Sequence, residues 1–360
     1  MKIAYLVGAR GVPVRGPSGA SAHVRGFAEG LQQAGHAVHV WAPLLSDGRG
    51  EHGAEVPATA TGVPGWPSWL DRARDLQEIW TSRRLSRAVI ERAYAEGIPD
   101  RLIERHALWS DAAWRVGAAL DRPWILEVNA PLAAERARYE VLRRPPFAAR
   151  WERDVLLAAP EIVAVSEWLA RWLVEEVGCA NVRRVWNGVS GLTGDRAAGR
   201  ARLGVEEGAR IIGFVGSMKP WHGVERLSAV ARALGARLAL IGPAPADPPP
   251  GAILTGALPP QALADVVAAL DLGLAPYPAD APPWFCPLKI LDYRAQGTPV
   301  IATDLGEARA LTGEGGAVVP PGDDDALIDA ARLWLGRRAA PWVRSWRAVA
   351  DEVLSTQQIP

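Results

Sequence analysis

The chain alternates short apolar runs with longer amphipathic segments. The run KIAYLVG at residues 2–8 is a continuous apolar stretch, as in strands buried on both faces of a parallel sheet. A Gly-rich loop follows, and residues 23–35 then have the apolar spacing of a helix that ends at Gly35. The next apolar run, residues 36–43, completes a strand–helix–strand unit.

This alternation continues in two blocks. In the first block, strands and helices are predicted within residues 100–108, 123–131, 161–176 and 182–190. The second block starts at Arg210, and its predicted elements lie within residues 210–217, 223–244, 252–278, 287–302 and 316–335. Residues 45–66, rich in Gly, Pro and charge, are predicted to cross irregularly. The fold class is therefore α/β, with two doubly wound Rossmann-like domains at 1–188 and 189–341.

Composition narrows the classes of function. The 40 basic and 40 acidic residues balance, which argues against a nucleic-acid partner. Two cysteines, Cys179 and Cys286, are too few for a disulfide framework and favour a cytoplasmic location. No apolar run is long enough to span a membrane, and the first residues lack the features of a signal peptide.

Ligands of open parallel sheets bind beyond the carboxyl ends of the strands, so residues just after predicted strands are the candidates. After the first strand, Gly16 and Gly19 allow backbone amides to approach a phosphate, although a plain turn has the same composition. His106 follows the strand near residues 102–103, where a surface histidine is the alternative.

Two further clusters lie in the second block. In GSMKPWHG, Gly216 allows close approach and Lys219 supplies positive charge, unless the segment is a loop with a solvated lysine. In PWFCPLKILDYRAQGTPVIA, Pro287 starts a helix whose first amides, at Leu288 and Lys289, form an anion site, and Asp292 lies on the same face. A nucleotide fits this pattern; a surface ion pair is the alternative.

The segments RHALWS, AVSEWLARWL, FVGSMKPWHGVERL and PLKILDYRAQGTPVIATD, in this order, resemble the retaining glycosyltransferases of the GT-B fold. The nearest resemblance is to the bacterial "group 1" (family 4-like) enzymes, from residue 2 to about residue 350. It implies two domains that face each other across a deep cleft. The first would bind the acceptor and the second the nucleotide sugar, and a last helix within about 342–360 would return to the first domain. The segment 341–354 has helical apolar spacing.

The resemblance also implies roles for single residues. The family's usual motif is Glu, seven residues, Glu. Its ribose-binding second Glu falls on Asp292, and its sugar-binding first Glu falls on Trp284, whose ring face would stack on a sugar. The family's phosphate-binding Arg and Lys fall on Ser217 and His222, so Lys219 and Lys289 would replace their charge.

The remaining family positions lie in the first block. The histidine near the donor sugar falls on His106, and Gly19 falls in the glycine pair near the donor phosphates. Glu127 and Asn129 follow a strand and are predicted to bind the acceptor or to form a polar loop. The charged run 135–154 is predicted to be a solvated helix face, with a peripheral contact to anionic lipid as the alternative.

The expected reaction moves a glycosyl group from a nucleoside diphosphate sugar to a hydroxyl acceptor (saccharide, lipid-linked or small molecule) with retention. No cofactor and no metal are expected: no Asp-x-Asp motif stands out, and 323–325 is predicted to start a helix. The product would be a polysaccharide, a glycolipid or a glycosylated natural product. The alternatives are a nucleotide-sugar epimerase of the same fold and a non-catalytic nucleotide-sugar-binding protein.

Overall fold

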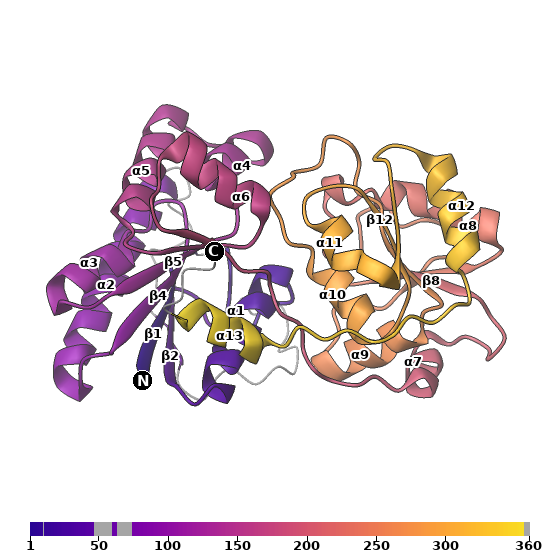
Figure 1. Cartoon of the computed structure of the whole chain (residues 1–360), viewed down its shortest axis with the longest axis horizontal. Coiled ribbons are helices and arrows are strands. Elements are labelled where there is room, and N and C mark those ends of the chain that lie inside the picture. The colour runs from indigo at the N-terminus through magenta and orange to yellow at the C-terminus, as the bar shows by residue number, and fades with distance from the viewer. Residues whose placement is uncertain (10, 47–59, 63–73, 356–360) are drawn as a thin grey trace.

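The computed structural model of the protein describes residues 1–9, 11–46, 60–62 and 74–355. Two parallel sheets, each covered by helices, lie side by side along the long axis of the molecule (Figure 1). The strands are buried because helices cover both faces, which is why they read as continuous apolar runs. The predicted fold class is confirmed.

Within the described residues, the first sheet has the strand order β3-β2-β1-β4-β5-β6-β7. Its strands are β1 (Lys2–Val7), β2 (Ala37–Ala42), β3 (Ala60–Gly62), β4 (Arg101–Arg105), β5 (Trp124–Val128), β6 (Ile162–Ala164) and β7 (Val182–Arg184). The connecting helices are α1 (Gly19–Gln33), α2 (Arg74–Glu96), α3 (Ala112–Leu120), α4 (Leu132–Tyr139), α5 (Pro145–Ala158) and α6 (Glu167–Arg171), which continues as a π-helix over Trp172–Val177.

The second sheet has the order β10-β9-β8-β11-β12-β13. Its strands are β8 (Ile211–Val215), β9 (Arg237–Ile241), β10 (Ile253–Leu254), β11 (Leu272–Ala275), β12 (Val300–Thr303) and β13 (Gly316–Val319). Its helices are α7 (Arg196–Leu203), α8 (Leu227–Leu234), α9 (Pro260–Ala269), α10 (Leu288–Ala295), α11 (Ala308–Thr312) and α12 (Asp324–Trp334), with 3-10 turns at Pro220–His222, Val224–Arg226 and Gly313–Gly315. Asp323 caps α12 through the amide of Ala326, so the predicted helix start at 323–325 is confirmed.

Three regions differ from the sequence prediction. Within the predicted irregular crossing 45–66, Ala60–Gly62 is a strand paired with β2, and residues 47–59 and 63–66 lie outside the described residues. Helix α2 was not predicted. The charged run 135–154 is only partly solvated, because Glu152 is buried.

The last helix, α13 (Trp346–Leu354), returns to the first domain and packs on α1, as the resemblance implied (Figure 1). Trp346 is buried against Gly26 and Gly30 of α1. The two chain crossings between the domains lie side by side, since the amide of Val189 donates to the carbonyl of Arg344 at 2.9 Å.

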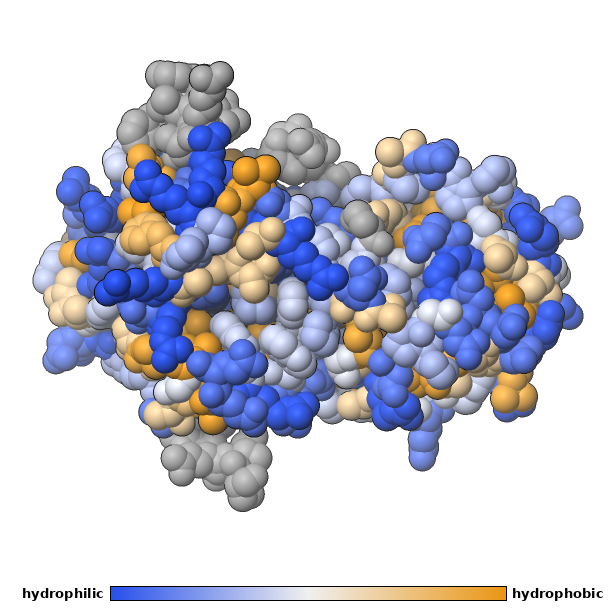
Figure 2. Space-filling model, turned by 90° about the horizontal axis from the view of Figure 1, so that it is seen from above, coloured by the Kyte–Doolittle hydropathy of each residue, from blue (hydrophilic) through white to orange (hydrophobic). Residues whose placement is uncertain are grey.

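The face seen in Figure 2 is mostly polar, with apolar residues in small groups. Among the helices of the described ranges, none combines the length and the apolar character needed to cross a bilayer.

We predict that Gly30→Ala destabilises the protein, by about 1–3 kcal/mol as for an overpacked core. In the interior of a solvent-exposed helix, replacing Gly by Ala would stabilise the folded protein by up to about 1 kcal/mol. Here a Cβ would collide with the backbone carbonyl of Trp346. Urea unfolding monitored by tryptophan fluorescence measures the change.

The control is Gly191→Ala, because a Cβ at Gly191 meets no atom within 4 Å. Equal stability of the Gly30 and Gly191 variants would show that α13 does not press on α1 in solution.

Candidate functional site

The candidate site lies at two points where the strand order reverses. In the first sheet the reversal falls between β1 and β4, and in the second between β8 and β11. Open α/β sheets bind ligands beyond the strand ends at such points. The Gly19 loop and His106 follow β1 and β4, and the Lys219 turn and Lys289 follow β8 and β11. These four predicted residues therefore lie at the carboxyl ends of the central strands of the two sheets.

The loops at these edges contact each other across the domain boundary. The Tyr139 ring of α4 lies 4.4 Å from the Trp221 ring, centroid to centroid. Ser166 donates to the carbonyl of Trp284 at 2.7 Å. An ideal Cβ on Gly19 would lie 3.8 Å from Leu288 Cδ1. The beginning of α1 thus faces the beginning of α10.

Helix α10 is held on the sheet by Tyr293. Its hydroxyl accepts from the amide of Val215 at 2.9 Å and lies 3.2 Å from the carbonyl of Leu274. The ring packs where a Cβ on Gly273 would otherwise stand. The structure makes Pro287 the buried N-cap residue and Leu288 the first helical residue, one position later than predicted. The free amides of this first turn attract anions.

Lys289 lies in an aromatic pocket at this helix end. Its Nζ donates to the Tyr277 hydroxyl at 2.9 Å and lies 4.5 Å from the Phe214 ring centroid. The residue is 7% exposed, and burial lowers its pKa to about 7. Lys289 forms no ion pair with any residue that the structure describes, so the alternative of a surface ion pair is wrong.

Asp292 lies one turn further along α10 and is half-buried. Burial raises the pKa of its carboxyl to about 7, and the charge of Lys289 opposes that rise. Within the described ranges Asp292 has no hydrogen-bond partner. Its oxygens are therefore available to accept hydrogen bonds from a ligand.

The turn after β8 brings Gly216, Ser217, Lys219 and His222 together. Gly216 has φ 153° and lies beside the Lys289 side chain. Ser217 is half-buried and Lys219 is exposed. The Lys219 amide donates to His222 Nδ1 at 3.1 Å, and burial, Lys289 and Lys219 lower the pKa of His222 to about 2. A neutral His222 adds no positive charge to this turn, so the positive charge near it comes from Lys219 and Lys289.

His106 is buried behind the end of β4. Its Nε2 lies 3.0 Å from Glu152 Oε1, while its Nδ1 has no partner among the described residues. Glu152 also accepts from the amides of Leu132 and Ala133 at the start of α4. Glu152 was missed by sequence reasoning, because it lies 46 residues from His106 within a charged run.

Glu127 is surrounded by donors of its own chain. Its Oε1 lies 2.7 Å from His23 Nε2, 2.9 Å from Arg105 and 2.6 Å from Asn129 Nδ2, and its Oε2 accepts from Tyr5. Only 4% of the residue is exposed. These contacts fit the alternative interpretation of Glu127, a polar residue that holds the loop after β5 in place. Contact with an acceptor stays a prediction for Asn129, which is half-buried.

Trp284 does not offer an open ring face. The residue is 8% exposed and its ring centroid lies 5.6 Å from that of Trp168. Its Nε1 donates to Glu135 Oε2 of α4 at 2.9 Å. The expected stacking on a sugar does not fit this burial, because first-domain side chains cover the indole.

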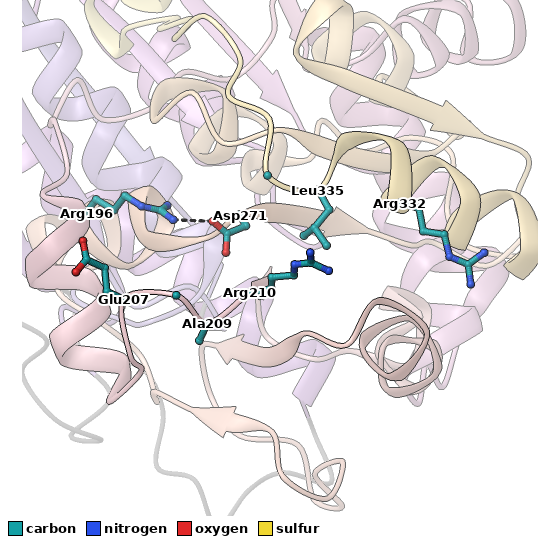
Figure 3. A pocket seen from close by; sticks show the side chains of 9 residues that line it. Arg196, Glu207, Ala209, Arg210, Asp271, Arg332 and Leu335 are labelled. Atoms are coloured by element: carbon teal, nitrogen blue, oxygen red, sulfur yellow. Dashed lines mark hydrogen bonds and ion pairs between the residues drawn. The ribbon is translucent and has the colours of Figure 1, made fainter.

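A separate pocket of about 300 Å³ lies at the opposite edge of the second sheet (Figure 3). Arg210 and Asp271, which line it, directly precede β8 and β11, so it faces away from Lys289. Arg196 spans it to Asp271 at 2.6 Å. Among the described residues, no three His, Cys, Asp or Glu side chains converge as metal ligands would.

We predict that Glu127→Gln lowers the free energy of unfolding by about 3–5 kcal/mol at pH 7, as for a broken buried ion pair. The interactions with His23, Arg105 and Asn129 outweigh burial and hold the pKa of Glu127 at about 2 in the folded protein. The carboxylate therefore stabilises the fold above the unfolded pKa of 4.5, and this stabilisation is lost as pH falls toward 2.

Urea titrations from pH 7 to pH 3 should show the difference between wild type and variant shrinking as pH falls. The control is Glu29→Gln, at an exposed site on α1. A difference that is constant with pH would contradict the ionised state of Glu127.

Two family models match the chain. The model of glycosyltransferase family 4 matches residues 17–190, and the model of glycosyl transferases group 1 matches residues 209–336. A relative from Mycobacterium tuberculosis, a GDP-mannose-dependent alpha-mannosyltransferase, is 30% identical over 235 residues. That match covers 58% of this chain and 60% of the relative, so the chain spans about three fifths of the relative's length.

Solved glycosyltransferase structures share the fold. Sucrose-phosphate synthase from Thermosynechococcus elongatus superimposes with a TM-score of 0.70 at 16% identity, over 98% of this chain and 94% of that one. Anabaena Alr3699/HepE, in complex with UDP and glucose, superimposes with a TM-score of 0.65 at 18% identity, over 98% and 95%. Together with the family models, which span both halves, these observations show that the chain belongs to the GT-B glycosyltransferases, with a family 4 first domain and a group 1 second domain.

Proposed function

We propose that the protein transfers a sugar from a nucleoside diphosphate sugar to a hydroxyl acceptor, with retention of the anomeric configuration. The supporting observation is Lys289, a buried amine that forms no salt bridge with a described residue and lies at the start of α10, where Leu288 faces Gly19 of α1. Two helix N-termini and a cation that converge on one place suit a diphosphate.

The same groups would serve catalysis as well as binding. When the bond between the sugar and the phosphate breaks, negative charge develops on the leaving diphosphate. Lys289, Lys219 and the amides at Leu288 and Lys289 would stabilise that charge, most strongly from a water-poor pocket. The leaving phosphate oxygen would take the proton of the attacking hydroxyl on the same face of the sugar. The reaction that we propose uses neither a metal ion nor a cofactor.

The other residues divide between the substrates. We assign the ribose hydroxyls to the unpartnered carboxyl of Asp292, and the diphosphate also to the backbone at Gly216 and Ser217. His106, with its free Nδ1, would face the donor sugar, and Asn129 the acceptor. Because one relative uses GDP-mannose and one neighbour holds UDP and glucose, we propose GDP-mannose and UDP-glucose as the first donors to test.

We place the protein in the cytoplasm, since Cys179 and Cys286 are both free thiols. Within the charged run, the exposed apolar residues Val141 and Phe147 flank Arg143 and Arg144 in the sequence. We propose that this part of the run contacts an anionic membrane surface. A lipid-linked acceptor or a polymer precursor would be met at that surface.

We predict that Lys289→Met weakens nucleotide-sugar binding by about 1.5–3 kcal/mol through loss of a charge-assisted hydrogen bond. With a pKa of about 7, Lys289 is largely neutral at pH 8.5 in the free protein. A bound diphosphate raises the pKa of Lys289, so binding at this pH is coupled to the uptake of a proton from solvent. Affinity should therefore fall as pH rises above 7. Calorimetry at pH 8.5 in buffers of different ionisation enthalpy measures the proton taken up.

Lys2→Met, on the exposed first residue of β1, is the control. Proton uptake that persists in the Lys289 variant would assign the titration to another group.

We also predict that His106→Ala lowers turnover at least tenfold while nucleoside diphosphate affinity changes little, because His106 would face the sugar and not the phosphates. His36→Ala, at a half-buried position just before β2, is the control. Product analysis in the same assay separates the alternatives: an epimerase converts the donor without acceptor, and a non-catalytic binder converts nothing. Full turnover in the His106 variant would make it a structural residue.

A further inference from the structure

Glu135 is a carboxylate of the first domain that lies against the second. It projects from α4, the helix that follows β5, and its Oε2 accepts from Trp284 Nε1 at 2.9 Å. Trp284 lies in the loop between β11 and α10, and the same loop leads directly into Lys289. The carboxylate is therefore next to the segment that begins the proposed diphosphate site.

No basic residue in the described ranges forms an ion pair with Glu135. Burial raises its pKa, the Trp284 hydrogen bond opposes this, and Glu140 and Glu152 raise it further. Neighbouring carboxylates are paired instead: Glu140 with Arg74 at 3.0 Å and Glu78 with Arg136 at 2.7 Å. A half-buried carboxylate with one neutral donor from the protein leaves its other hydrogen-bond positions to water or to a ligand.

Glu135 is also connected to His106. Glu152 accepts both from His106 and from the amides that begin α4, so one buried carboxylate orients the histidine and the helix that carries Glu135. The sugar of a nucleotide sugar is bonded to the phosphate furthest from the base. For a diphosphate at the start of α10, we place the sugar on the side of the first-domain groups that contact this loop.

An ionised carboxylate accepts about four hydrogen bonds and donates none. The indole N–H occupies one position and fixes the direction of the group. Sugar hydroxyls are the donors that suit the other positions, and a pair of neighbouring hydroxyls can bind both oxygens.

We propose that Glu135 binds hydroxyls of the donor sugar from the first domain, and that Trp284 is its positioning residue. This inference rests on the proposed function. It moves the sugar-selecting carboxylate from the nucleotide-binding domain, where position 284 is a tryptophan, to the opposite domain. Sugar recognition then requires the two domains to be in contact.

The test compares Glu135→Gln, Trp284→Phe and Glu140→Gln with wild type, using GDP-mannose, UDP-glucose, GDP and UDP as probes in calorimetry. In the Glu135→Gln variant the new side-chain amide oxygen can still accept from Trp284, so melting temperature should stay unchanged. Glu140→Gln, at the C-cap of the same helix, removes a neighbouring negative charge and is the control for charge alone. For the sugar that wild type binds, we expect Glu135→Gln to lose about tenfold or more in affinity, and less than about twofold for the corresponding diphosphate. Trp284→Phe should show the same pattern with a smaller loss.

Equal losses for nucleotide sugar and diphosphate, or no loss for either, would overturn the role of Glu135 while leaving the proposed function in place. A wild-type protein that binds none of the four probes would overturn the proposed function, and this inference with it.

Discussion

The burial of one cation is the constraint around which the second domain is built. Lys289 can remain buried because Tyr277 and Phe214 face its ammonium group and Gly216 leaves room for its stem. The helix that carries it must stay in register with the sheet, and the Tyr293 hydroxyl secures this through β8 and β11. A buried ammonium group is costly without an anion, and for this reason we propose a negatively charged ligand at this position.

The first domain contains a buried anion, the carboxylate of Glu127. Glu127 is compensated by His23, Arg105 and Asn129, which come from α1, β4 and the loop after β5. The network joins the Gly-rich loop's helix to the sheet and keeps its N-terminus aimed at α10. The first domain thus pairs its buried charge directly, whereas Lys289 of the second domain has only the longer-range attraction of Asp292. We propose on this basis that the second domain binds the donor and the first domain the acceptor.

Much of the fold follows from local pattern, because strands such as β1 and β12 are buried on both faces and therefore apolar throughout. Helix α2 could not be predicted in this way: its buried face carries the hydroxyls of Thr81 and Ser82, which donate to a backbone carbonyl and to the distant Asp111. In the candidate site, Lys289 and Asp292 could be proposed from the sequence because the start of a helix is set by residues adjacent in the chain. Glu152 and Glu135 could not, since their partners lie in other elements and, for Glu135, in the other domain.

The paired crossings at Val189 and Arg344 have a mechanical consequence. The two segments that connect the domains are paired by a backbone hydrogen bond and form one hinge. This hinge allows the domains to rotate about the line of the paired segments, but it restricts translation and twisting of one domain relative to the other. Because Trp284 and Glu135 belong to different domains, a rotation about this line would break the hydrogen bond between them. The same geometry makes a swap of α13 between two molecules difficult, because the helix reaches its place on α1 through a connection that is already fastened.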